Sequence, residues 1–229
     1  MRVVVDPSVK AGRRRVMDSP VFQDFLRRLG GATWSGVITV FNTDFWKGRV
    51  HTLQVTVAGK GKPWPDLYTL RGPTVDVLVM ITDGRRRYVA IVEQYRAAVG
   101  GRVLSNVAGG IDDGESVMAA AARELREELG VGEELSISYE LLLRHPVLAS
   151  PGITNERVHM VRATITVKAS QLSPFLRSLQ NKRTGVAEEG EEITTRVVAI
   201  VVANEARDFI RRRQQPDAKT LLSFALAGL

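Results

Sequence analysis

The stretch that decides the fold runs from Gly109 to Val131 and reads GGIDDGESVMAAAARELREELGV. Glycines stand near both ends, and the alanine-rich run from Glu115 to Leu129 contains neither glycine nor proline. This composition predicts a helix over residues 115–129, because alanine has the highest helix propensity and glycine and proline have the lowest.

Helical spacing divides this segment into an apolar face and an acidic face. At about 100° per residue, one narrow face collects Met118, Ala122, Leu125 and Leu129. A second face carries three carboxylates, Glu124, Glu127 and Glu128. Carboxylates three or four residues apart on a helix repel one another by a few tenths of a kcal/mol per pair. A divalent cation would relieve that repulsion, because hard cations such as Mg²⁺ prefer oxygen ligands.

The overall composition bounds the class of protein. The chain has 229 residues, enough for one large domain or one domain with an appendage. It contains no cysteine, which excludes disulfides and cysteine-ligated zinc or iron–sulfur sites. It contains no run of 18 apolar residues, so we expect no membrane span. These features leave the compartment open, and we expect an intracellular location, cytoplasmic or organellar.

Positive charge is concentrated in short arginine runs. The net charge is +7 and the pI is about 10.0, with runs at residues 13–15, 27–28, 85–87 and 211–213. A basic surface can attract nucleic acid or phosphorylated substrates. No aromatic residues interleave these runs, so solvated surface is the favoured interpretation and RNA stays an open alternative. The first 17 residues lack the apolar core of a secretory signal, which predicts a basic tail or a short organellar transit peptide.

Residues 1–72 form a leader ahead of the main domain. Ser19 and Pro20 predict the start of a helix over residues 18–29, as N-cap and first helical residue. Strand-like segments follow at residues 36–41 and 50–57. We expect too little apolar material for an independent core, so the leader should pack on the main domain or on a second subunit.

Residues 73–229 alternate strands and helices without the regular rhythm of a doubly wound fold. The predicted strands are residues 75–82, 88–93, 102–107, 134–143, 156–167 and 193–202. The predicted helices, besides 115–129, are residues 172–179, 203–213 and 218–226. The pattern indicates an α/β fold with a mixed sheet flanked by helices.

The central stretch resembles the Nudix box. Its spacing is Gly109, five residues, Glu115, seven residues, then RELxEExGV from Arg123 to Val131, which agrees at nine fixed positions. The structural alternative is a solvated helix with Glu/Arg pairs. The resemblance implies an α/β/α sandwich at residues 73–229, a hydrolase that cleaves nucleoside diphosphates linked to another group, and a leader that serves in dimerisation.

Flanking segments resemble the ADP-ribose and ADP-sugar pyrophosphatase branch. They are EQYR at 93–96, ASPG at 149–152, GEEI at 190–193 and DAKTL at 217–221. The resemblance implies hydrolysis of a nucleoside diphosphate sugar, of ADP-ribose, ADP-glucose or UDP-glucose type, to nucleoside monophosphate and sugar phosphate. Two alternatives stay open: an enzyme acting on capped RNA or dinucleotides, and a non-catalytic nucleotide- or RNA-binding protein of Nudix fold.

The same resemblance implies roles for individual residues. The metal ligands would be the Ala108 carbonyl and the carboxylates of Glu124, Glu127 and Glu128, holding two or three Mg²⁺ ions, with Mn²⁺ as an alternative. Glu127 and Glu128 would act in catalysis, and Glu191 is the best match to a loop base. The alternative interpretation of that loop is a solvated acidic segment without a catalytic role. Arg123 and Glu115 would support the ligands.

Substrate contacts come from outside the box. Arg96 would hold a phosphate, and the turn of Ser150, Pro151 and Gly152 would shape the sugar side. Trp34 and Trp46 are candidates for stacking on the base, in a site completed by a homodimer partner, although core packing is the commoner fate of such residues. Directly before the box, residues 105–107 read SNV where relatives usually carry ELP. We expect this protein to differ from its relatives there.

Overall fold

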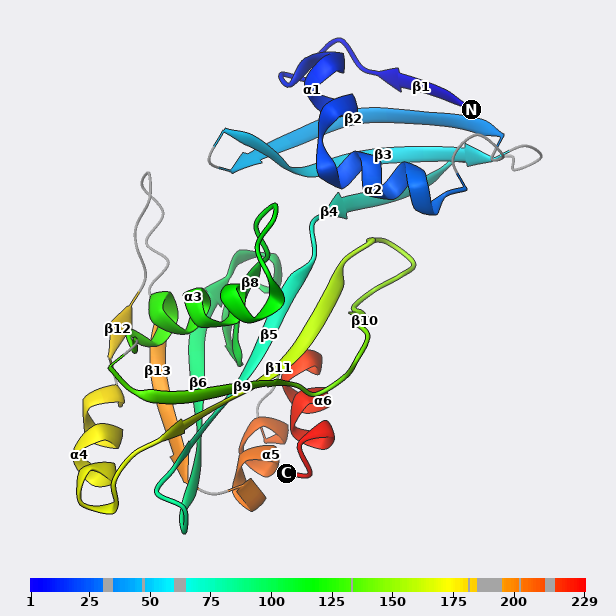
Figure 1. Cartoon of the computed structure of the whole chain (residues 1–229). Helices are drawn as coiled ribbons and strands as arrows, with labels where there is room; N and C mark the ends of the chain where they lie inside the picture. The colour runs from blue at the N-terminus through cyan, green and yellow to red at the C-terminus, as the bar shows by residue number, and fades with distance from the viewer. Residues whose placement is uncertain are drawn as a thin grey trace. The chain divides into compact units, whose positions relative to one another are not determined.

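A computed structural model describes residues 1–30, 35–46, 48–59, 65–132, 134–180, 182–184, 195–201, 203–212 and 217–229. The chain divides into two compact units. The first is Met1–Pro73 with Leu148–Arg157, and the second is Thr74–Val147 with Val158–Leu229. Figure 1 follows the chain through both. None of the helices in the described residues is long and apolar enough to cross a membrane.

The first unit is a sheet with two helices packed on one face. Within the described residues, the sheet has four strands in the order β1-β2-β3-β4. Their bounds are β1 Arg2–Val5, β2 Gly36–Trp46, β3 Arg49–Gly59 and β4 Asp66–Arg71. β1 runs parallel to β2, and the other two pairs are antiparallel. The helices are α1 Gly12–Asp18 and α2 Pro20–Arg28, and Ser19 caps α2 as predicted by accepting from Phe22 N.

This unit has a hydrophobic core of its own, so the expectation that the leader lacks one is wrong. Alternate residues of β2 and β3 face the helices, and Phe22 and Leu26 of α2 pack against them. The buried set also includes Ile38, Val40, Leu53, Val55, Val57 and Leu70. Each fully buried aliphatic side chain stabilises the fold by roughly 1.5–3 kcal/mol. The strand β4, which was not predicted, completes the face.

The first 17 residues belong to this folded unit. β1 pairs with β2 from Arg2 opposite Val37 to Val5 opposite Val40. Val16 of α1 is fully buried, and Val9 is nearly so. The predicted basic tail is therefore wrong, because the arginines of α1 face solvent while its apolar residue enters the core.

The second unit contains a mixed sheet of nine strands among the described residues. The path is β10-β11-β5-β6-β13-β12, with β7 paired to β6, β8 to β5 and β9 to β11. The central strands are β5 Thr74–Thr82, β6 Arg87–Arg96, β11 Arg157–Thr166 and β13 Thr195–Val201. The shorter ones are β7 Gly101–Ser105, β8 Val107–Gly110, β9 Ser136–Leu141, β10 Val147–Leu148 and β12 Arg183–Thr184.

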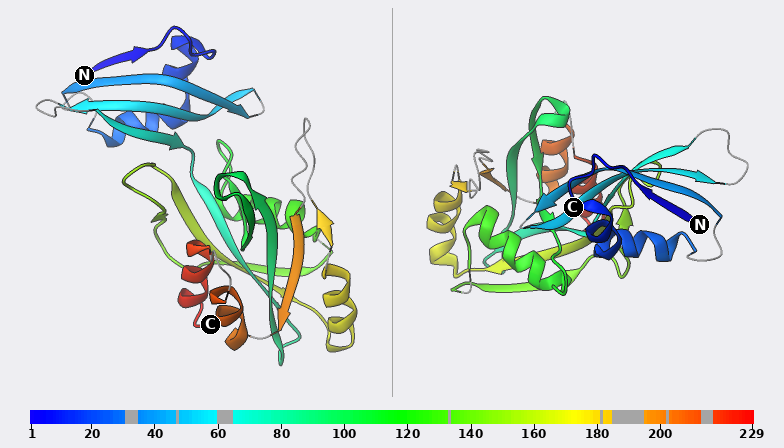
Figure 2. Two further views of the ribbon diagram at one scale, coloured as in Figure 1. Left: turned by 180° about the vertical axis from the view of Figure 1, so that it is seen from behind. Right: turned by 90° about the horizontal axis from the view of Figure 1, so that it is seen from above.

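Helices cover both faces of this sheet, which confirms the predicted α/β/α sandwich. The helices are α3 Val117–Leu129, α4 Ala169–Leu179, α5 Ala203–Arg211 and α6 Ala218–Leu226. Odd-numbered residues of β5, from Val75 to Ile81, pack toward α3 and α4. The even residues Leu78 and Met80 pack toward α5 and α6. Figure 2 shows the two helical layers from two further sides.

The predicted strand at residues 102–107 is two strands with different partners. β7 pairs with β6, from Val92 opposite Ser105 to Arg96 opposite Gly101. β8 pairs with β5, and Ala108 stands opposite Asp76. The change of partner falls at Asn106. This switch carries the chain from the edge of β6 to the edge of β5 and delivers Ala108 and Gly109 to the side of α3.

Candidate active site

Helix α3 presents the acidic residues. It begins at Val117, two residues later than predicted, because Ser116 is the N-cap and accepts from Ala119 N at 3.1 Å. It ends at Gly130, whose φ of 60° suits the left-handed cap that glycine adopts readily. The buried stripe is Ala120, Ala121, Leu125 and Leu129, with Met118 partly buried. The apolar face is thus centred one residue away from the predicted Ala122.

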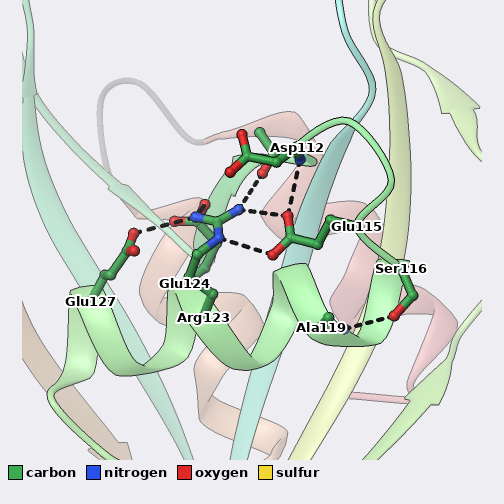
Figure 3. Close-up of polar contacts among 8 residues, drawn as sticks. Asp112, Glu115, Ser116, Ala119, Arg123, Glu124 and Glu127 are labelled. Atoms are coloured by element: carbon green, nitrogen blue, oxygen red, sulfur yellow. Dashed lines mark hydrogen bonds and ion pairs between the residues drawn. The ribbon is translucent and has the colours of Figure 1, made fainter. Parts of the chain in front are cut away.

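Arg123 is the centre of the polar contacts on this helix (Figure 3). Its guanidinium holds both carboxylate oxygens of Glu115, Nε to Oε1 and Nη2 to Oε2, each at 3.0 Å. Nη1 donates to Glu124 Oε1 at 2.6 Å and reaches Glu127 Oε2 at 3.3 Å. Nη2 also donates to the Gly110 carbonyl at 2.6 Å. These bonds, those to Glu115 foremost, raise the pKa of Arg123, so it stays charged.

Glu128 receives hydrogen bonds from two strands, β6 and β8. Gln94 of β6, which is buried, donates from Nε2 to Glu128 Oε1 at 2.7 Å. The backbone N–H of Ala108 on β8 donates to the same carboxylate. Burial nevertheless raises the pKa of Glu128 to about 8, and the nearby charge of Glu124 adds to the rise. Two neutral donors thus orient this carboxylate, and the effect of its burial prevails over them.

Glu124 is held against the backbone of the box. Burial raises its pKa, and the Arg123 guanidinium opposes that rise. A Cβ added at Gly109 would stand 1.9 Å from Glu124 Oε1 and 2.0 Å from Cδ. No real Cβ makes such a contact, so the Glu124 carboxylate occupies the space that only glycine leaves open. The glycine of the predicted motif therefore has a steric reason to be there.

The oxygen donors near Gly109 are of the kind that a hard divalent cation accepts. The predicted ligands are carboxylate oxygens from three glutamates of α3 and the carbonyl of Ala108, and Mg²⁺ accepts both kinds of oxygen. Among the described residues, no three acidic or imidazole side chains converge as a ready metal cage. Arg123 engages Glu124 and Glu127, whereas Gln94 engages Glu128. Burial raises the pKa values of Glu124 and Glu128, and a bound cation would offset the cost of keeping both carboxylates charged.

Comparison with known proteins agrees with this geometry. Residues 71–174 match the family described as NUDIX domain, a span that contains the whole of α3 and its glycine loop. The match covers a little under half of the chain, and residues 71–174 are thus similar to a Nudix domain.

Several curated proteins are similar to most or to about half of this chain. It is 27% identical over 232 residues to "Nudix hydrolase 14, chloroplastic" of Arabidopsis thaliana, covering 93% of this chain and 71% of that protein. It is 33% identical over 126 residues to the mouse "ADP-sugar pyrophosphatase", covering 52% of this chain and 56% of that protein. The yeast "ADP-ribose pyrophosphatase" is 29% identical over 128 residues, covering 52% and 53%. The chain thus spans little more than half of the last two.

A solved structure shows the same fold. The crystal structure described as an ADP compounds hydrolase superposes with a TM-score of 0.51 at 19% identity, over 83% of this chain and 92% of that one. At this identity the likeness concerns the fold alone.

The remaining predicted site residues fall in different places. Arg96 ends β6, is exposed, and lowers the pKa of Glu128 slightly through its charge, so it lies near the box. Ser150 heads a turn in the first unit, where its carbonyl accepts from the N–H groups of Ile153 and Thr154 at 3.0 Å. Pro151 and Gly152 of that turn are exposed.

Three further predicted site residues lie wholly or partly outside the described residues. Trp34 and Glu191 lie outside the described residues. Trp46 is the last residue of β2, and its side chain is outside the described part. The stacking and base roles of these residues stay predictions.

Sequence reasoning missed Gln94 as a partner of Glu128. The two residues are 34 positions apart, so no local spacing relates them. The available signal was a buried glutamine inside the strand YVAIVEQYR, where a side chain with two amide donors must find an acceptor.

Proposed function

We propose that this chain hydrolyses the diphosphate bond of a nucleoside diphosphate sugar, of ADP-ribose, ADP-glucose or UDP-glucose type, with Mg²⁺ as cofactor and Mn²⁺ as an alternative. The observation that carries the proposal is the box itself. Glu124 is seated on Gly109, and Glu128 is oriented by Gln94 and Ala108. The names of the mouse and yeast relatives support the substrate class.

The reaction adds water across the P–O–P linkage. The water oxygen bonds to one phosphorus, the bridging P–O bond breaks, and the products are a nucleoside monophosphate and a sugar phosphate. Glu124, Glu127, Glu128 and the Ala108 carbonyl would hold two or three Mg²⁺ ions. When bound, these ions lower the pKa of water and neutralise phosphate charge. Glu127 and Glu128 would act in catalysis, and we propose Glu191 as the residue that takes the proton of the attacking water.

Arg123 and Arg96 have distinct duties in this proposal. Arg123 orients Glu115, Glu124 and Glu127 through the bonds described above and has no donor directed elsewhere in that arrangement. Arg96 is exposed near Glu128, where a guanidinium can bind a phosphate with two parallel hydrogen bonds. The sugar-side role of Ser150–Gly152, base stacking by Trp34 or Trp46, and a homodimer follow from the resemblance alone.

The test is direct. Purified protein is incubated with ADP-ribose, ADP-glucose, UDP-glucose and GDP-mannose, with and without Mg²⁺, and nucleoside monophosphate is measured. We expect turnover of at least one substrate, dependent on the metal. The matched variant is Glu128→Gln, which can keep its contact with Gln94 but loses the charge. It should reduce turnover by at least about 100-fold while nucleotide binding persists. Folded wild-type protein that turns over none of the four contradicts the proposal.

One observation favours capped RNA as a second candidate substrate. The first unit contains 13 lysines and arginines against 6 acids, whereas the second contains 19 of each, so the whole net charge of +7 lies on the first unit. A basic unit in the same chain as the proposed hydrolase domain suits a polyanionic substrate. Cap release from RNA that exceeds turnover of every free nucleotide sugar, and that falls steeply with salt, would replace the first proposal by this one.

A further inference from the structure

The residue at which the chain changes strands, Asn106, is the centre of a buried polar cluster. Its backbone N–H donates to Thr220 Oγ1 at 2.9 Å, which satisfies a donor that neither strand ladder can use. Its side-chain amide donates twice, to Asp76 Oδ2 at 2.7 Å and to Ser223 Oγ at 2.6 Å. We call Asp76, Asn106, Thr220 and Ser223 the Asn106 network.

The Asn106 network joins two strands to the last helix. Asp76 comes from β5, and Thr220 and Ser223 come from α6. Ser223 Oγ donates back to the Thr220 carbonyl at 2.9 Å, and Thr220 Oγ1 donates to Asp217 Oδ2 at 2.8 Å. Each member has its hydrogen-bonding partner fixed by another element, so the position of the switch relative to β5 and α6 is specified.

A carboxylate at position 76 is unexpected on this buried face of β5, where packing alone would favour an apolar side chain. The next two even positions on β5 are Leu78 and Met80, which pack against α5 and α6. Asp76 is 0% exposed and Asn106 is 1% exposed. Within the described part of the chain, Asp76 Oδ1 and Asn106 Oδ1 have no hydrogen-bond partner. A buried polar group with an unsatisfied acceptor destabilises a fold, and an apolar pair would cost less.

The reason to retain this costly polar pair lies in the groups that the strand switch positions. At the switch, β7 leaves β6, and β8 joins β5. Glu128 takes one hydrogen bond from Gln94 on β6 and another from Ala108, two residues beyond Asn106 on β8. The separation of these two donors depends on where the chain crosses between the strands. That crossing is what the Asn106 network fixes.

We propose that Asn106 and Asp76 are positioning residues for Glu128, acting through the backbone of Ala108 and not by touching the substrate. This inference rests on the proposed function, because Glu128 is the carboxylate that it serves. It gives the departure at residues 105–107 a meaning: this chain fixes the strand switch with a polar pair.

The test replaces the pair by an apolar one. Asn106→Leu leaves Asp76 buried beside an apolar side chain, and the double variant Asp76→Val with Asn106→Leu removes both polar groups. The conservative variant Asp76→Asn retains an acceptor for Asn106. Leu78→Val is the matched control, since it lies on the same strand and face and keeps the Asn106 network intact. Melting temperature by circular dichroism, kcat and KM for ADP-ribose, and Mn²⁺ affinity by electron paramagnetic resonance are measured for each.

We expect the double variant to melt within a few degrees of the wild type or above it. Its kcat should fall by about 10–100-fold with KM changed less than about threefold, and its Mn²⁺ affinity should weaken by about tenfold. Asp76→Asn should stay within about threefold of wild type in all three constants. Leu78→Val should lower the melting temperature by a few degrees while kcat and Mn²⁺ affinity hold.

A folded double variant with wild-type kcat and Mn²⁺ affinity overturns the inference. If the double variant does not fold, Ser223→Ala removes one acceptor of the Asn106 amide and decides instead. A several-fold loss of kcat at unchanged KM supports the inference, and unchanged constants overturn it. A wild type that hydrolyses no nucleotide sugar defeats the proposed function, whereas the Mn²⁺ comparison still judges the positioning of Glu128.

Discussion

Gly109 leaves the space into which the Glu124 carboxylate packs, and a single added carbon would stand 1.9 Å from Glu124 Oε1. Glu124 is only 7% exposed, so its side chain has little room to withdraw. The neighbouring Gly110 differs, because a Cβ there meets nothing within 4 Å. Two adjacent glycines of one loop therefore have different reasons to be glycine.

We predict that Gly109→Ala displaces the Glu124 carboxylate and lowers turnover of ADP-ribose by about 100-fold, since a shift of about 1 Å in a catalytic group costs that much. Gly110→Ala is the control and should retain most of the activity, because only its backbone carbonyl contacts Arg123. Steady-state kinetics and circular dichroism on both variants provide the measurement. Equal kinetics in the two variants would refute the steric role of Gly109.

The parts of this fold that local chemistry specifies were predictable. Ser116 and Gly130 delimit α3, and Ser19 with Pro20 starts α2, because caps act within one turn. The sandwich followed from the order of apolar segments. The sequence underestimates the core of the first unit for two reasons. Its buried residues alternate with exposed ones along β2 and β3. The single buried residue of α1, Val16, directly follows three arginines in the sequence.

Of the candidate site, only the residues on helix α3 could be predicted from the sequence. The acidic face of α3 and the likeness at Arg123 could be recognised from spacing. Asn106 was flagged as a departure, but its partners Asp76 and Ser223 are 30 and 117 positions away in the chain. No periodicity relates such distant residues, since their approach depends on how β5, β8 and α6 assemble.

The stability of the metal-free protein should depend on pH through Asp76. Burial raises its pKa from 3.8 to about 7, and Asp217 adds to the rise, whereas the hydrogen bond from Asn106 and the charge of Lys219 oppose it. The folded state therefore retains a proton between about pH 4 and pH 7 that the unfolded chain releases. The free energy of unfolding falls as the pH rises through that window, by roughly 1.4 kcal/mol per unit of pKa shift.

We predict that Asp76→Asn removes this decline. Urea unfolding in the presence of a chelator at pH 4, 5.5, 7 and 8 gives the free energy of unfolding for both proteins. The variant should gain on the wild type steadily from pH 4 to about 7 and keep a constant advantage above it. Glu128, whose pKa is also raised, is common to both proteins and cancels in the difference. Parallel curves across the whole range would show that Asp76 does not titrate in this window.

The first helix should contribute to stability in spite of its charge. Val16 of α1 is fully buried in the core of the first unit, whereas Arg14 is 96% exposed and forms a 3.7 Å ion pair with Asp18. We predict that Val16→Ala lowers the free energy of unfolding by about 1–3 kcal/mol. Arg14→Ala should change it by less than about 0.5 kcal/mol. Chemical denaturation of both variants measures the difference, and equal values would mean that this segment is a tail after all.

Asp24 links the segment Leu148–Arg157 to helix α2 of the first unit. It accepts from Arg157 Nη1 at 3.0 Å and from Arg28 Nε at 2.7 Å. Burial works against its charge, but these two arginines prevail and hold the pKa of Asp24 below its usual value. Asn155 of the same segment accepts from Arg71 N at 2.8 Å. Thr69 N also donates to the Ile153 carbonyl at 2.9 Å, so the segment is held by α2 at one end and by β4 along its length.

We predict that Asp24 and Arg157 are energetically coupled. A double-mutant cycle with Asp24→Asn and Arg157→Gln should give an interaction free energy of about 1 kcal/mol, because both side chains are only about a quarter exposed and the bond is charge-assisted. Arg27, which is 74% exposed and also faces Asp24 at 3.3 Å, is the matched control. A cycle of Asp24→Asn with Arg27→Gln should give less than about 0.5 kcal/mol. Equal coupling in the two cycles would mean that Arg157 is an ordinary surface partner and that the segment is held by Asn155 and its backbone contacts instead.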